Sequence, residues 1–111
     1  MEERILSINE VEWKSIRSDI TEGILGFPLF PRELSNTKIT VTRVKQGCTF
    51  PRHKDDYHHV FYFIDGDGEG WLGGQSFQIS PGLIVQVPAG VTHGYRNTGD
   101  RDLLLLTINI E

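Results

Sequence analysis

The chain of 111 residues contains one cysteine, Cys48, and lacks any uninterrupted apolar run of the roughly 18 residues that suggest a membrane helix. A single cysteine excludes an intramolecular disulfide framework and fits a reducing compartment. No basic and apolar leader stands at the start, so the sequence predicts a cytoplasmic protein with no membrane partner. The chain also lacks a basic cluster and has a formal net charge of −4, which argues against nucleic acid as a partner.

Helical periodicity is missing from every long window after residue 37. The segment 37–46 is instead β-branched and alternating, as half-buried strands are, and residues 103–110 form an apolar closing strand. Between them, turn residues recur about every eight to twelve positions, which is typical of a small β-barrel or sandwich. We therefore expect one all-β domain at residues 37–111.

Residues 1–36 are less regular than the rest of the chain. Their apolar stretch around Phe27, Leu29 and Phe30 is interrupted by glycine and proline, which break long regular elements. We expect this segment to be an N-terminal extension that packs on the barrel or on a dimer partner. No catalytic motif is found in it.

Three of the four histidines fall within seven residues. Of these, His53 and His59 share the parity of Asp55, so in an extended chain all three side chains can face one cavity. His58 has the opposite parity and is expected to face away. The fourth histidine, His93, lies in a second patterned stretch, residues 82–97.

Together the two stretches resemble the two motifs of the cupin family. The first motif is matched in spacing by Gly47, His53, Asp55, His59 and Gly66, and the second by Gly82, Pro88, Gly90, His93 and Asn97. The resemblance covers roughly residues 37–110. It implies an all-β double-stranded β-helix, the jelly-roll β-barrel of two antiparallel sheets, and it implies a homodimer.

Cupins bind a metal ion through two histidines and a glutamate of the first motif and a histidine of the second. In this chain Asp55 replaces the second histidine and His59 replaces the glutamate, so three imidazoles and one carboxylate remain. We interpret this as a permuted site in which His53, Asp55, His59 and His93 hold one divalent transition metal ion, Fe, Mn, Ni or Zn. The pair His53 and Asp55 with a distant His93 also resembles the facial triad of non-haem iron oxygenases. The alternative is an ordinary solvated loop.

The strand after His59 is apolar on both faces, which suits a two-sheet sandwich or a subunit interface. Aromatic residues near the motifs suggest an apolar pocket for a small molecule, with a few polar anchors. The residues expected to line it are Phe61, Phe63, Trp71, Tyr95 and Arg43. Arg43 or Arg52 would anchor an acidic substrate, and no catalytic acid or base is assigned.

Three functions fit this reading, because a fold does not select its chemistry. The favoured one is a metal-dependent enzyme with dioxygenase-type chemistry on a small organic molecule. The second is isomerisation or ring opening of an acidic sugar, similar to small cupins of sugar catabolism. The third is a ligand-binding or sensor module without turnover.

Overall fold

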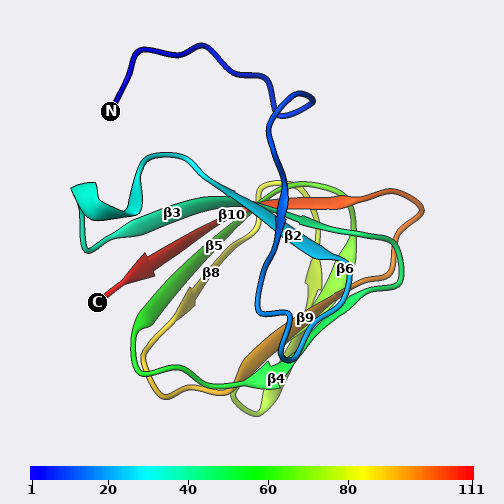
Figure 1. Ribbon diagram of the computed structural model, residues 1–111. Coiled ribbons are helices and arrows are strands. Elements are labelled where there is room, and N and C mark those ends of the chain that lie inside the picture. The colour runs from blue at the N-terminus through cyan, green and yellow to red at the C-terminus, as the bar shows by residue number, and fades with distance from the viewer.

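The computed structural model describes residues 1–111 and contains ten strands and one short 3-10 helix (Figure 1). The strands are β1 (Lys14–Ser15), β2 (Ile24–Pro28), β3 (Lys38–Val44), β4 (Thr49–His53), β5 (His58–Asp65), β6 (Gly68–Leu72), β7 (Gln75–Ile79), β8 (Ile84–Val87), β9 (His93–Asn97) and β10 (Leu103–Ile110). The helix, η1, spans Arg32–Leu34. No helix has the length and hydrophobicity that a membrane span requires.

The strands form two sheets in which every pairing is antiparallel. One sheet has six strands in the order β1-β2-β3-β10-β5-β8, and the other has four in the order β4-β9-β6-β7. Strands that are distant in the sequence are therefore neighbours, since β10 pairs with both β3 and β5. This arrangement confirms the expected double-stranded β-helix of two antiparallel sheets.

The three central strands of the larger sheet are apolar at one end of the barrel interior and polar at the other. The apolar end is made by Val44, Phe63, Leu103 and Leu105, and the polar end by Thr40, Thr42, His59, Thr107 and Asn109. The strand register aligns apolar residues with apolar ones and polar residues with polar ones, because Leu103 lies opposite Val44 and Asn109 opposite His59. One end of the barrel is thus a packed core, and the other is left open for a site.

Strand β5 buries one face only. His59, Phe61 and Phe63 are buried, whereas Tyr62 and Ile64 remain 44% and 41% exposed. The sequence is apolar on both faces, but the outer face of this strand has no cover within the single chain. That outer face is available for contact with another molecule.

The N-terminal segment joins the larger sheet through β2, which pairs with β3, while β1 pairs with β2. Gly26 permits this arrangement, because a Cβ atom there would lie 2.3 Å from Ile16 Cδ1 and 2.9 Å from Thr40 Cγ2. Ile16 can therefore pack directly on the backbone of β2. The next residue, Arg17, is delivered to the open end of the barrel. Figure 1 shows the chain before β1 leading away from the barrel.

Candidate metal centre

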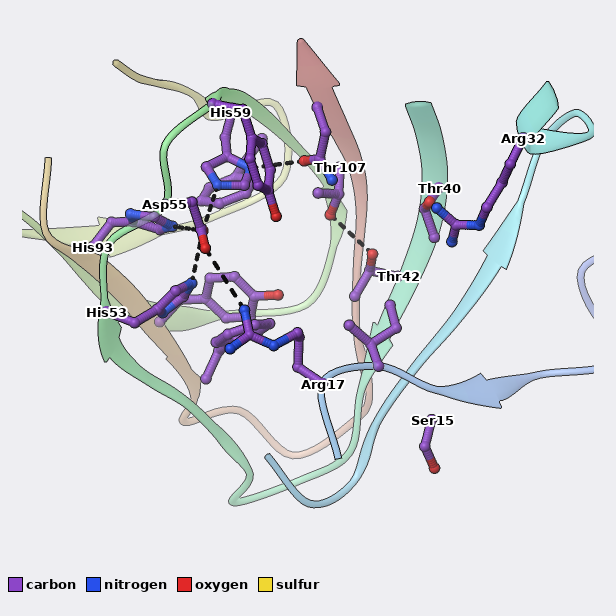
Figure 2. A pocket seen from close by; sticks show the side chains of 16 residues that line it. Ser15, Arg17, Arg32, Thr40, Thr42, His53, Asp55, His59, His93 and Thr107 are labelled. Carbon is purple, nitrogen blue, oxygen red and sulfur yellow. Dashed lines mark hydrogen bonds and ion pairs between the residues drawn. The ribbon is translucent and has the colours of Figure 1, made fainter. Parts of the chain in front are cut away.

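Three histidines from three different strands meet around Asp55 at the open end of the barrel (Figure 2). His53 ends β4, His59 is near the start of β5 and His93 starts β9. Asp55 Oδ2 lies 2.8 Å from His59 Nε2, 3.2 Å from His53 Nε2 and 3.7 Å from His93 Nε2. Strand pairing in the two sheets therefore brings the residues of the two sequence stretches together in one cluster.

His53 and His93 are oriented in the same way. Each Nδ1 donates a hydrogen bond to the backbone carbonyl two residues earlier, over 2.7 Å to Pro51 and 2.9 Å to Val91. A ring nitrogen that donates carries the proton, so the other nitrogen, Nε2, keeps its lone pair. Both Nε2 atoms point towards Asp55.

His59 uses a side-chain acceptor instead. Its Nδ1 donates to Asn109 Oδ1 over 2.7 Å, a contact between neighbouring strands β5 and β10. The same tautomer follows, with the Nε2 atom directed at Asp55. This second partner fixes the ring, as carboxylates and carbonyls behind metal-bound histidines commonly do.

These four side chains present three imidazole lone pairs and one carboxylate to a common point. Such a set of donors repels itself unless a cation, either a proton or a metal ion, lies among them. The donor atoms of His53, Asp55 and His93 all lie within 4.8 Å of one another and can share one ion. His59 lies outside this closest group and reaches it through Asp55.

The surroundings of Asp55 and His93 favour the protonation states that bind metal. Burial alone would raise the pKa of Asp55, but the contact with His59 and the proximity of His53 and His93 together lower that pKa below its ordinary value. Burial is the main reason why the pKa of His93 is lowered. An ionised carboxylate and a neutral imidazole are the forms that ligate an ion.

His58 takes no part in the cluster. It is exposed, and its Nδ1 accepts a hydrogen bond from the backbone N–H of Ala89 over 2.9 Å. Its position agrees with the strand parity that separates it from His59.

The cluster lies in a cavity of about 330 Å³, near the lower end of the usual range for small-molecule sites. Two of the residues expected there, Phe61 and Tyr95, line it. The remaining lining residues are Ser15, Ile16, Arg17, Arg32, Thr40, Thr42, Phe50, His53, Asp55, Tyr57, His59, His93, Thr107 and Asn109. Burial raises the pKa of Tyr57 and of Tyr95, so both phenols stay protonated.

Phe63, Trp71 and Arg43, also expected at the pocket, lie elsewhere. Phe63 is fully buried and belongs to the core below the cavity. Trp71 and Arg43 have the outward parity of their strands: Trp71 stacks with Arg52, whose Cζ is 4.8 Å from its ring, and Arg43 lies 4.5 Å over Trp13. Neither arginine named from the sequence can therefore anchor a ligand in the cavity.

The cavity has two other arginines, Arg17 and Arg32, that sequence reasoning missed. Both come from the N-terminal segment, where no motif marks them. Arg17 has a positive φ of 48°, a conformation that non-glycine residues seldom adopt and that nothing in the sequence indicates. Asn109 was missed as well, although its parity in the closing strand offered a signal once β10 is paired with β5.

Comparison with known proteins agrees with this fold. Residues 40–109 match the cupin domain family, and the chain belongs to that family. It is 40% identical over 52 residues to the quercetin 2,3-dioxygenase of Bacillus subtilis strain 168. That match spans 46% of this chain and only 15% of the dioxygenase.

Solved structures match over nearly the whole chain. The polyketide cyclase RemF from Streptomyces resistomycificus has a TM-score of 0.84 at 18% identity, covering 98% of this chain and 79% of RemF. A predicted oxalate decarboxylase from Thermotoga maritima has a TM-score of 0.84 at 20% identity, covering 96% of this chain and 98% of its own. KdgF from Halomonas sp. has a TM-score of 0.78 at 16% identity, with coverages of 97% and 95%. At these identities the likeness establishes the fold alone.

Proposed function

We propose that the protein is a metal-dependent cupin enzyme that acts on a small organic molecule. One divalent transition metal ion, Fe, Mn, Ni or Zn, would be held by His53, Asp55, His59 and His93. The observation that carries this proposal is the convergence of three imidazole Nε2 atoms on one carboxylate, with every Nδ1 proton already donated to a protein acceptor. Nitrogen and carboxylate donors in this ratio suit those ions.

A bound ion would supply Lewis-acid or redox chemistry at this position. The chain contributes orientation and shielding. Asp55 would offset one unit of the ion's charge, and Asn109 would hold His59 in the ligating tautomer. Phe50 and Phe61 form an apolar wall beside the donors, while the hydroxyl groups of the cavity remain free to hydrogen-bond a substrate.

Dioxygenase-type chemistry is the favoured reaction because the curated relative is a quercetin 2,3-dioxygenase, 40% identical over 52 residues. An open donor set of histidines and one carboxylate is also the usual make-up of non-haem iron oxygenases. The chain spans too little of that relative for its substrate to be carried over.

The second candidate is isomerisation or ring opening of an acidic sugar. It is supported by Arg17 and Arg32, which give the cavity the cationic groups that such a substrate needs. A ligand-binding module without turnover is the third candidate. In its favour, the cavity contains no carboxylate or histidine beyond the four proposed ligands.

Oxygen uptake tests the favoured reaction. The full chain, loaded anaerobically with Fe(II), would be mixed with quercetin and with representative diketones, thiols and phenols. We expect catalytic oxygen consumption with at least one of them, and its loss in His93→Ala but not in the control His58→Ala. Stoichiometric metal with no oxygen consumption would refute the dioxygenase assignment. A thermal-shift screen with uronic acids tests whether such acids bind. Product analysis of any acid that binds then distinguishes the second candidate from the third, since only the second requires product formation.

A further inference from the structure

The charge of the cavity is opposite in sign to the charge of the molecule. The chain has a formal net charge of −4. Among the residues that line the cavity, Arg17 and Arg32 are positive and Asp55 is the single acid. A divalent ion at the donors would add to this excess. A concave site with positive groups in a negative protein concentrates field at the cavity and favours negatively charged small molecules.

Arg17 is fixed at the donor end of the cavity. Its Nε and Nη2 atoms donate to the two carboxylate oxygens of Asp19 at 3.1 and 3.2 Å, whereas Nη1 makes no hydrogen bond. Nη1 lies 3.6 Å from Asp55 Oδ1, beyond hydrogen-bond length, and Figure 2 shows the guanidinium directed at Asp55. Nη1 thus forms an ion pair with Asp55 but no hydrogen bond, and an anion that approaches the donors meets an N–H group of Arg17 that donates to no protein acceptor.

Arg32 lies on the opposite side of the cavity from the histidines, beyond Thr40 and Thr42 in Figure 2. It takes part in none of the chain's ion pairs, and its guanidinium donates no hydrogen bond. Its backbone is held in place, because Lys38 Nζ donates to the Arg32 carbonyl. Arg32 is an exposed residue, and it gives the cavity a second positive group that donates to no protein acceptor.

Residues with hydroxyl groups line the cavity as well. Thr42 Oγ1 and Thr107 Oγ1 are 2.9 Å apart and share one hydrogen bond, so one hydroxyl proton of the pair remains for a ligand. Tyr95 lines the same cavity, and its hydroxyl makes no hydrogen bond within the chain. These groups suit a ligand with hydroxyl or oxo oxygens rather than a hydrocarbon.

We propose that the ligand of this cavity is a small carboxylic acid that also carries a hydroxyl or oxo group. Arg32 binds the carboxylate at the far side. The hydroxyl or oxo oxygen faces the donors of His53, Asp55 and His93, with Arg17 stabilising the negative charge that gathers there. This assignment of substrate class rests on the proposed function, whichever reaction the site performs.

The test compares acids with their neutral amides on the full-length protein. Glucuronate with glucuronamide, and phenylglyoxylate with phenylglyoxamide, would be titrated calorimetrically at low salt into metal-loaded and EDTA-treated protein. We expect at least one acid to bind more tightly than its amide by about tenfold or more, as loss of a charge-assisted hydrogen bond implies. Arg32→Gln should remove this preference, and Arg17→Gln should reduce it, with metal content unchanged. The control Arg52→Gln changes an arginine that stacks on Trp71 outside the cavity, and it should bind like the wild type.

Two results would overturn the proposal. One is equal affinity for acid and amide, or no binding of either acid. The other is an acid preference that survives Arg32→Gln. If the proposed function fails but this proposal holds, the result is different. Protein without a specific metal site would still show the Arg32-dependent preference for the acid over its amide in the EDTA-treated sample.

Discussion

His59 Nδ1 and Asn109 Oδ1 lie 2.7 Å apart across strands β5 and β10, although fifty positions separate the residues in the chain. This hydrogen bond selects the tautomer that directs His59 Nε2 to Asp55. It also ties the last strand of the barrel to the first motif. The closing strand therefore contributes to the metal centre as well as to the core.

Replacing Asn109 by alanine should lower metal affinity by about ten- to a hundred-fold, the usual effect of removing a partner behind a metal-bound histidine. The barrel should remain folded, because Asn109 lies at the open end. Competition titration with a chelating dye measures the affinity. Asn109→Asp keeps an acceptor for Nδ1 and should restore most of it, whereas equal affinities for the wild type and Asn109→Ala would show that His59 needs no such support.

Asp55→Asn should weaken metal binding by more than the roughly hundred-fold upper value for a supporting residue. The reason is that the neutral amide no longer offsets the charge of the ion. The fold should survive, since Asp55 lies in the loop between β4 and β5. Metal content after dialysis and circular dichroism measure the two effects.

His58→Ala is the matched control for Asp55→Asn, because His58 is exposed and lies outside the cluster. It should retain its metal. Full metal content in Asp55→Asn together with metal loss in His58→Ala would mean that the strand presents the other histidine to the site.

Gly26→Val should destabilise the protein by about 1–3 kcal/mol, the usual cost of overpacking. Its new Cβ would meet Ile16 at 2.3 Å and Thr40 at 2.9 Å. Displacing Ile16 should also move Arg17 from the cavity. Urea unfolding measures the loss, with Gly74→Val as a control because a Cβ at that position meets nothing within 4 Å. Equal destabilisation by the two variants would contradict the packing role of Gly26.

The protein is expected to form a homodimer. Leu29, in the N-terminal segment, is 49% exposed and Ile84, on β8 beside the outer face of β5, is 61% exposed. Each marks a separate apolar surface, and exposed apolar patches are typical of interaction sites. Light scattering at micromolar concentration should give twice the monomer mass. Leu29→Glu and Ile84→Glu, measured separately, identify which surface is used. A wild-type monomer at that concentration would refute the dimer.

The sequence predicted the two sheets and brought His53, Asp55, His59 and His93 together because strand parity and turn spacing are local signals. The prediction that Trp71 and Arg43 line the pocket was wrong, because both side chains have outward parity in their own strands. Parity alone does not say which face is inner, so that assignment depends on sheet pairing. Arg17 and Arg32 could not be found, because a positive φ and the packing of Ile16 against Gly26 depend on contacts between distant segments.

Metal analysis of protein purified without a histidine tag tests the central claim most directly. Inductively coupled plasma mass spectrometry on the protein at its natural loading should find close to one divalent transition metal ion per chain. His93→Ala should lose it, and His58→Ala should keep it. Wild-type protein with no stoichiometric metal, and no uptake after dialysis against Fe(II), Mn(II), Ni(II) or Zn(II), would contradict the account.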